Sequence, residues 1–560
     1  MFRPLLYKTF YTLGKREVAR FDRDAQTVDA TQSRHLLDII QRNAASAFGK
    51  KHGFSSIQSV RDFQNAVAIN DYDSLSEYVN RAAAGEKGQL TVEDPFMFAT
   101  TSGTAGERKM IPVTRSYIKE FRRASVVSGF NLLKSHPNLT KGIALSVFSP
   151  AEEGRTEGGI PYGAISGRLY MEEPKLIKRF ISPIPYEVFI IKHYESRYYT
   201  LLRLALALPV TVIYTLNPST IVMLGKRLKI YGEQLVRDIA DGAINSPQAL
   251  PSQVMEAIKP FLKPNPKRAA ELAKLLEQDK FEAQNIWPDL SLISCWTKAA
   301  ASFYLQDLPA YFGSTPVADI TYGASEGRGT VNLGEGRQAL SIRSHFFEFV
   351  AVDDWEAGNK KALLCHELEV GREYYILFTT SGGLYRYHIN DIVKVVGWYN
   401  RTPLIEFLHK GGNISSFTGE KLTESQVTEA MLAAQKELNF RARFFTLIPV
   451  FRPEPHYELY LEFDGPSVSD ETALAKAFDR HLSRLNIEYE AKRESHRLTD
   501  IKVVRLPAES YERLRKELVG QGVPDAQIKV SHLNPKDQIR QMIQGFEEVG
   551  STAVSPIGSH

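Results

Sequence analysis

Residues 98–109, Phe98-Ala99-Thr100-Thr101-Ser102-Gly103-Thr104-Ala105-Gly106-Glu107-Arg108-Lys109, form the most informative stretch of the chain. Short β-like runs surround this loop. Its two glycines expose backbone N–H groups, and its threonine and serine hydroxyls add short donors, so the loop can cradle anionic oxygens. It is not a Walker loop, because the GxxxxGK(S/T) pattern is absent. Taken alone, it is equally consistent with a surface turn rich in Gly, Ser and Thr.

A second motif lies at residues 320–327, Ile320-Thr321-Tyr322-Gly323-Ala324-Ser325-Glu326-Gly327, where a β run ends in a turn of small residues. Such a turn can place Tyr322 against a nucleotide base. It can also present Glu326 to Mg²⁺, which prefers carboxylate and phosphate oxygens. The alternative is an ordinary strand end with a solvated glutamate.

A third motif lies at residues 383–393, Gly383-Leu384-Tyr385-Arg386-Tyr387-His388-Ile389-Asn390-Asp391-Ile392-Val393. An aspartate at the start of a strand, here Asp391, can accept hydrogen bonds from both hydroxyls of a ribose. The alternative is an ion pair of Arg386 with Asp391 on the surface, which contributes little to stability.

The distribution of patterns along the 560 residues predicts two domains. Residues 1–85 have helical patterns, and residues 286–396 contain short β runs bounded by Gly, Pro, Asn or Asp. The Lys-Gly-Gly-Asn stretch at 410–413 indicates a hinge, and a helix, a β hairpin and another helix follow it. We therefore predict a large N-terminal α/β domain over 1–409, a hinge over 410–418 and a smaller mobile α+β domain over 419–560.

Composition excludes several classes of protein. The 69 basic and 65 acidic residues leave a formal net charge of +4, so no nucleic-acid partner is indicated. No apolar run approaches the length of about 20 residues that a membrane span needs, and no membrane partner is expected. Only two cysteines are present, and basic residues interrupt the N-terminal apolar residues, so we expect a cytoplasmic protein.

The order of the three motifs, followed by a hinge and a small domain, resembles the adenylate-forming superfamily with its firefly-luciferase-like fold. Within it, the chain is similar to the auxin-responsive acyl acid–amido synthetase family, best known from plants. The similarity runs over about residues 85–540. It includes further pieces at Ile111-Pro112, Asp238-Ile239, Ile286-Trp287-Pro288-Asp289-Leu290, Val331-Asn332-Leu333, Phe347-Glu348-Phe349, Glu369-Val370-Gly371, Phe378-Thr379-Thr380 and Gly419-Glu420-Lys421-Leu422-Thr423-Glu424.

The resemblance implies ATP and Mg²⁺ as cofactors and assigns roles to ten residues. Thr101, Ser102, Gly103 and Thr104 would hold the phosphates of ATP. Tyr322 would contact adenine, Gly323 and Ser325 would lie beside the nucleotide, and Asp391 would bind the ribose. Glu326 would ligate Mg²⁺, and Lys529 would reach the adenylation site from the small domain. Ser102, Glu326 and Lys529 would thus be the catalytic residues.

The chain departs from the plant pattern near the third motif. Plant members usually have Arg and Gly where this chain has His388 and Asn390, and they have a Thr-Gly pair near residues 296–300 that is lost here. These departures leave the nucleotide residues intact. They put plant-hormone substrates in doubt and favour a bacterial member of the family.

The implied reaction activates a small carboxylic acid to an acyl-adenylate and conjugates it to an amino acid or other amine, with release of AMP and pyrophosphate. Aromatic and small residues at 162–169 and 296–304 favour an aromatic or indolic acid, although such clusters are more often core than pocket. Two alternatives stay open: a ligase that forms acyl-CoA or carrier-protein thioesters, and an inactive ligand-binding scaffold. The sequence does not predict the oligomeric state.

Overall fold

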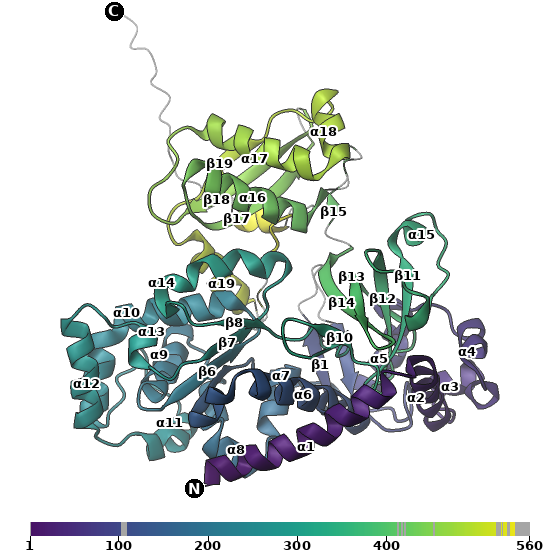
Figure 1. Cartoon of the computed structure of the whole chain (residues 1–560), viewed down its shortest axis with the longest axis horizontal. Coiled ribbons are helices and arrows are strands. Elements are labelled where there is room, and N and C mark those ends of the chain that lie inside the picture. The colour runs from purple at the N-terminus through teal and green to yellow at the C-terminus, as the bar shows by residue number, and fades with distance from the viewer. Residues whose placement is uncertain are drawn as a thin grey trace, which may run out of the picture. The chain divides into compact units, whose positions relative to one another are not determined.

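The computed structural model divides the chain into two compact units, Met1–Leu408 and His409–His560 (Figure 1). The structure describes residues 2–101, 109–411, 414–415, 418, 420, 422–451, 454–521, 528, 530–534 and 538–543.

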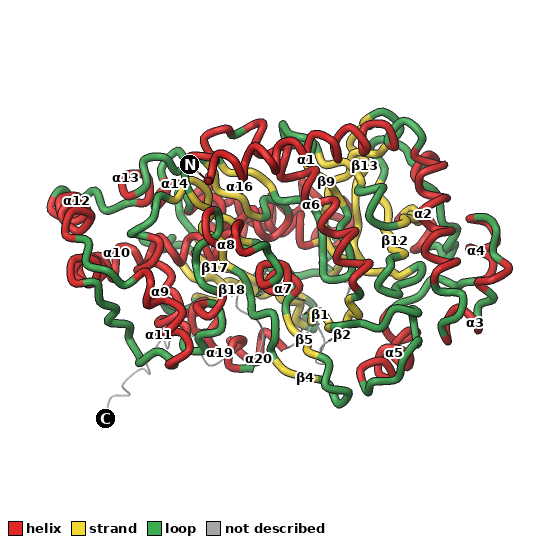
Figure 2. Tube along the Cα trace, turned by 90° about the horizontal axis from the view of Figure 1, so that it is seen from below, coloured by secondary structure: helices red, strands yellow, loops and turns green. Residues whose placement is uncertain are grey.

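The first unit begins with five helices, as the helical patterns over residues 1–85 predict. They are α1 (Phe2–Asp24), α2 (Val28–Arg42), α3 (Ala47–Lys51), α4 (Val60–Ala66) and α5 (Tyr72–Ala83). Local capping fixes where three of them start, because Ser46, Ser59 and Asp71 each accept a hydrogen bond from a backbone N–H in the first turn. α1 packs along α6 (Arg115–Ser135), and both views of the chain show this pair (Figures 1 and 2).

Two sheets of the first unit carry the three sequence motifs. One has the order β2-β1-β5-β4, and the other has the order β11-β12-β13-β14-β10-β9. The strands of the first are β1 (Met97–Thr101), β2 (Lys109–Val113), β4 (Gly154–Arg155) and β5 (Pro161–Gly163). The strands of the second are β9 (Thr330–Asn332), β10 (Gln338–Leu340), β11 (Phe346–Ala351), β12 (Glu373–Thr379), β13 (Tyr387–Tyr399) and β14 (Thr402–Lys410).

A third, parallel sheet has the order β3-β6-β7-β8. Its strands are β3 (Ile143–Val147), β6 (Val210–Thr215), β7 (Leu292–Cys295) and β8 (Val317–Asp319). Helices α9 (Tyr194–Ala205), α10 (Pro218–Asp241) and α12 (Pro266–Glu277) pack beside it (Figure 1). Asn217 caps α10 and Pro218 opens it, and Gly242 ends it in the left-handed region with φ +69°.

The remaining helices of the first unit are short. They are α7 (Ile165–Met171), α8 (Lys175–Phe180), α11 (Ser252–Ile258), α13 (Ala283–Ile286), α14 (Pro309–Phe312) and α15 (Val352–Glu356). Two hydrophobic clusters fill the unit, one around the mixed sheets and one around the parallel sheet. Cys295 and Cys365 are buried free thiols, and burial raises the pKa of Cys295 to about 12, so neither resembles a nucleophile.

The second unit is α+β. Its main sheet has the order β17-β18-β19, with β17 (Ala442–Val450) antiparallel and β19 (Lys502–Arg505) parallel to β18 (His456–Phe463). Its other elements are β15 (Ile414–Ser415), β16 (Leu422–Thr423), α16 (Glu424–Leu438), α17 (Glu471–Leu485), α18 (Ile487–Glu494), α19 (Ser510–Gly520) and α20 (Gln538–Ile543). The sequence predicts α16, α17 and the β17–β18 hairpin. It does not predict β19, whose pairing partner lies about 40 residues away along the chain.

A search of the described residues for a helix long and apolar enough to cross a membrane found none.

Candidate active site

The predicted phosphate loop joins two strands of one antiparallel pair. Thr101, the last residue of β1, pairs with Lys109, the first residue of β2, so the ends of the loop are held together. The Tyr72 hydroxyl accepts from the backbone N–H of Met110 at 3.0 Å and thereby ties β2 to α5. Ser102, Gly103 and Thr104 lie outside the described residues, so their phosphate-binding role stays a prediction.

The second motif folds into a tight hydrogen-bonded turn over residues 322–330. The Tyr322 carbonyl accepts from the backbone N–H groups of Gly329 and Thr330 at 3.0 and 3.1 Å. The Tyr322 N–H in turn donates to the Thr330 hydroxyl at 2.8 Å. Glu326 lies within this turn and is only 7% exposed. The alternative of a solvated glutamate at an ordinary strand end is therefore wrong.

Tyr322 and Asp391 are brought together by the fold. The Tyr322 hydroxyl donates to Asp391 Oδ2 at 2.7 Å, and the Tyr322 ring stacks on Phe407 with a centroid distance of 5.4 Å and an interplanar angle of 8°. Burial, and then the negative charge of Asp391, raises the pKa of Tyr322 well above its usual value. The residues predicted to bind adenine and ribose are thus direct neighbours, although they are far apart along the chain.

Gly329 leaves the space that the Tyr322 ring occupies. A Cβ atom at Gly329 would lie 2.1 Å from Cδ1 of that ring. We expect Gly329→Ala to displace the ring, break its hydrogen bond to Asp391 and raise KM for ATP by about fivefold, since a lost buried hydrogen bond costs about 1 kcal/mol. Steady-state kinetics with varied ATP measures this. Gly397→Ala is the matched control, because its Cβ would make only an ordinary 3.6 Å contact with Leu404.

An irregularity in β13 explains why this chain has Asn390 where plant relatives usually have glycine. Asn390 adopts φ +64°, a left-handed conformation that asparagine tolerates better than most residues. The pairing of β12 with β13 shifts register here, between the Tyr375 and Leu377 pairs. Such a bulge re-aims the side chains that follow it, of which Asp391 is the first. His388, the other departure, stacks on Trp355 at 4.2 Å between ring centroids.

Arg386 does not pair with Asp391, so the surface-pair alternative is wrong as well. Arg386 is buried, and its Nε donates to Glu348 Oε2 at 3.0 Å. Its Nη1 donates to the carbonyl oxygens of Val67 at 2.6 Å and Gln64 at 3.0 Å. The guanidinium therefore joins β11 to the α4 region.

Tyrosines from three elements, two of them fully buried, lie within the electrostatic field of Glu326. Tyr117 on α6, Tyr322 on the turn and Tyr387 on β13 all have pKa values raised by burial first and in part by the Glu326 charge. The Tyr117 hydroxyl also donates to the Ser325 carbonyl at 2.8 Å and holds the turn against α6. Ser325 is thus positioned through its backbone. The sequence does not reveal that Tyr117 contributes to the site, because its partner Ser325 lies 208 residues away along the chain.

Glu326 is the buried carboxylate of the predicted magnesium site. Among the described residues, no three His, Cys, Asp or Glu side chains gather to hold a metal ion. Mg²⁺ is commonly bound by one or two carboxylates together with substrate phosphates and water. A single buried carboxylate, Glu326, is consistent with that kind of site.

Lys529 lies outside the described residues, but its surroundings in the second unit are described. Ile528 and Val530 on either side of it are buried. The Ser531 hydroxyl and the His532 backbone N–H both donate to Glu424 Oε1 at 2.7 Å. The chain just after Lys529 is therefore fixed to the start of α16.

Comparison with known families and proteins gives consistent matches over most of the chain. Three family models match consecutive segments: the GH3 family N-terminal domain over residues 17–317, the GH3 family central domain over 338–410 and the GH3 family C-terminal domain over 425–538. Indole-3-acetic acid-amido synthetase GH3.8 of Oryza sativa subsp. indica is 26% identical over 555 residues, which cover 92% of this chain and 90% of that protein.

Jasmonoyl–L-amino acid synthetase JAR6 of Nicotiana attenuata is 24% identical over 537 residues, 90% of this chain and 91% of that protein. Among solved structures, GH3.15 acyl acid amido synthetase superposes on this chain with a TM-score of 0.83 and a sequence identity of 20%. The aligned region covers 95% of this chain and 95% of that chain. This similarity confirms the predicted fold class: a large α/β part followed by a smaller α+β part.

Proposed function

The chain belongs to the GH3 family, which confirms the family resemblance of its sequence, and we propose that it is an ATP-dependent acyl acid–amido synthetase. It activates a small carboxylic acid as an acyl-adenylate and transfers the acyl group to an amino acid or other amine. The curated relatives described above are named amido synthetases and align over about nine-tenths of their length, which supports this reaction class.

One observation carries the proposal in this structure: Tyr322, Glu326 and Asp391 lie close together, and both carboxylates are buried. Tyr322 Oη donates to Asp391 at 2.7 Å, and Glu326 lies four residues from Tyr322 within the same turn. Neither carboxylate is more than 7% exposed. Carboxylates suit this role chemically, because they can accept hydrogen bonds from ribose hydroxyls and can ligate Mg²⁺.

The chemistry needs activation because a carboxylate has no good leaving group. Its oxygen attacks the α-phosphorus of ATP, the bond from that phosphorus to the bridging oxygen breaks, and pyrophosphate leaves with the electron pair. In the second step an amine attacks the acyl carbon, AMP leaves, and the amine loses a proton. The protein contributes mainly positioning and charge stabilisation, which can supply much of the rate enhancement.

Each group of predicted site residues would have a different role in this reaction. Thr101, Ser102, Gly103 and Thr104 would donate hydrogen bonds to the phosphates, and Tyr322, Gly323, Ser325 and Asp391 would orient the nucleoside. Glu326 would hold Mg²⁺, which when bound neutralises phosphate charge. Lys529 would add positive charge during adenylation. The chain divides at Leu408 and His409, next to the predicted hinge at 410–418, which supports a rotation of the second unit between the two steps.

Acid-dependent pyrophosphate release tests the proposal. The purified chain is incubated with ATP and Mg²⁺ and a panel of aromatic, indolic and short aliphatic acids, first alone and then with amino acids or with coenzyme A. We expect pyrophosphate release with a subset of acids, and AMP together with a new amide, identified by mass spectrometry, once an amino acid is added.

The controls separate the alternatives. Release that leads to a thioester with coenzyme A, and to no amide, would replace the amido synthetase with a thioester ligase. No release with any acid, from a folded protein that also fails to bind MgATP in calorimetry, would leave only an inactive scaffold. Reactions without acid and without Mg²⁺ define the background.

A further inference from the structure

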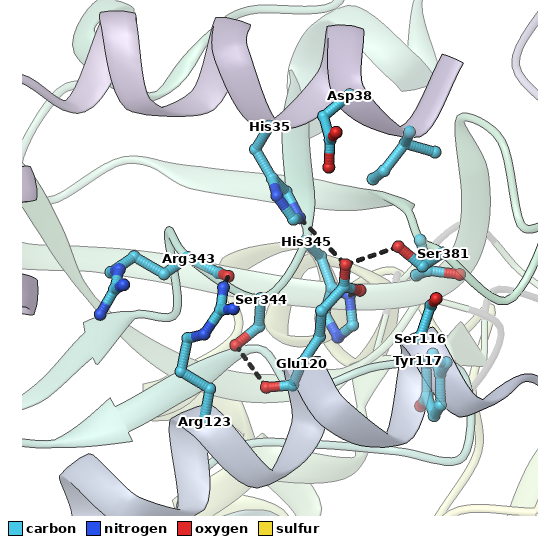
Figure 3. Close-up of polar contacts among 12 residues, drawn as sticks. His35, Asp38, Ser116, Tyr117, Glu120, Arg123, Arg343, Ser344, His345 and Ser381 are labelled. Carbon is cyan, nitrogen blue, oxygen red and sulfur yellow. Dashed lines mark hydrogen bonds and ion pairs between the residues drawn. The ribbon is translucent and has the colours of Figure 1, made fainter. Parts of the chain in front are cut away.

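A buried polar cluster lies beside α6 (Figure 3). Its centre is Glu120 of α6, which is 5% exposed. Ser381 donates its hydroxyl to Glu120 Oε1 at 2.5 Å, and Arg42 Nη2 lies 3.8 Å from the same oxygen. The titratable and charged groups that face Glu120 are His35, Asp38 and Arg42 from α2, Tyr117 and Arg123 from α6, and His345 from the segment before β11.

His345 connects this cluster to the turn. It is fully buried, and its Nε2 accepts the backbone N–H of Arg328 at 3.0 Å. Burial lowers the pKa of His345 to about 3, so the ring is neutral near pH 7. A neutral ring that accepts at Nε2 must carry its proton on Nδ1. The turn therefore fixes the tautomer of His345.

The Nδ1 atom faces Glu120. It lies 3.9 Å from Glu120 Oε2, and in the described part of the chain neither atom has a hydrogen-bond partner within normal distance. Burial raises the pKa of Glu120 to about 7. A buried donor and a buried acceptor that face each other and lack other partners gain by approaching. Glu120 thus offers an acceptor to the Nδ1–H of His345, which is the tautomer that leaves Nε2 free to accept from the Arg328 N–H.

We propose that Glu120 and His345 are a positioning pair that holds the backbone of the 322–330 turn, and through it Glu326, in the geometry that binds MgATP. This inference rests on the proposed function for the identity of the ligand. Two further contacts reinforce it: the Tyr117 ring stacks on His345 at 5.6 Å between centroids, and Tyr117 donates to the Ser325 carbonyl. α6 therefore supports the turn through Ser325 and, by way of His345, through Arg328.

The decisive variant is His345→Phe. Phenylalanine keeps an aromatic ring beside Tyr117 but leaves the Arg328 N–H without its acceptor. In the protein without ligands, we expect hydrogen–deuterium exchange of the peptide over residues 326–330 to become about tenfold faster, equivalent to about 1.4 kcal/mol of lost protection. KM for MgATP should rise by a similar factor, with KM for the acid unchanged.

His35→Phe is the matched control, because His35 Nε2 also lies 3.9 Å from a carboxylate oxygen of Glu120, Oε1. Unlike His345, however, His35 hydrogen-bonds to the backbone of Ser344 and not to the turn. This variant should leave exchange at residues 326–330 as in the wild type. Two variants test the role of Glu120. Glu120→Leu should accelerate exchange of the peptide over residues 326–330, whereas Glu120→Gln keeps an acceptor oxygen and should leave this exchange unchanged. Thermal melting identifies any variant that fails to fold, and in that case the remaining variants decide.

Unchanged exchange in His345→Phe, or equal acceleration in His35→Phe, would overturn the inference. A purely structural role would lower the active fraction, and thus apparent kcat, without changing KM for MgATP. If the wild type releases no pyrophosphate with any acid, the proposed function fails. The exchange measurements would still decide whether the pair positions the turn.

Discussion

Replacing Glu326 with alanine is expected to lower acid-dependent pyrophosphate release by about a hundredfold or more, the scale seen when one electrostatic contact to a reacting centre is removed. Glu326 is buried, and three tyrosines from three different elements lie within its field. Under the proposed function, this carboxylate is the group that would hold Mg²⁺. Its removal should cost transition-state stabilisation, and kcat should fall more than KM for the acid.

The measurement is kcat and KM at several Mg²⁺ concentrations. Glu326→Gln, which keeps the volume and removes the charge, should resemble the alanine variant, because charge is what the metal needs. Glu335→Ala removes a glutamate whose side chain is 85% exposed, and it should have the activity of the wild type. If the activity of Glu326→Ala is within about threefold of the wild type, the loss is far smaller than expected for a lost electrostatic contact. That result would show that another residue holds the metal ion.

Asp391→Asn should raise KM for ATP by about 10- to 100-fold, because hydrogen bonds to a charged acceptor contribute about 1.5–3 kcal/mol. The substitution keeps the shape of the side chain and removes its charge. The 2.7 Å hydrogen bond from Tyr322 orients the carboxylate, so Tyr322→Phe should have a smaller effect. The two effects should not add, since the residues are in direct contact.

Deoxynucleotides make this test specific for the ribose. The wild type should discriminate against 2′-deoxy-ATP and 3′-deoxy-ATP, because each lacks one of the two hydroxyls that would donate a hydrogen bond to Asp391. The Asp391→Asn variant should discriminate much less. Equal discrimination by the wild type and the variant would place the ribose contact on another residue.

The local elements and the chemistry of the motifs could be predicted from the sequence. Asn217 followed by Pro218 is a local signal for the start of α10, and the helix predicted after the hinge is α16 (Glu424–Leu438). Signals of this kind depend on residues within one helical turn, so they survive in any tertiary context. The motif residues Tyr322, Glu326 and Asp391 were recognisable for a similar reason, because their order along the chain matches a family.

The surroundings of those residues could not be predicted. Taken alone, the third motif is consistent with an ion pair of Arg386 with Asp391, which are five residues apart, whereas the structure pairs Arg386 with Glu348 and Asp391 with Tyr322. Proximity along the chain is a poor guide here, because a bulge at Asn390 changes which way the side chains point. His388 and Asn390, which look like departures from the family in the sequence, have structural roles in the fold.

By itself, the sequence determined the family and the fold class, since these follow from local patterns and their order, and it predicted the candidate site residues. Only the tertiary structure showed that Tyr117 and His345 hydrogen-bond to the turn that carries Glu326, and that Glu120 lies beside His345. Each of these contacts joins elements far apart along the chain, and their packing, which no local periodicity encodes, decides which buried polar groups meet.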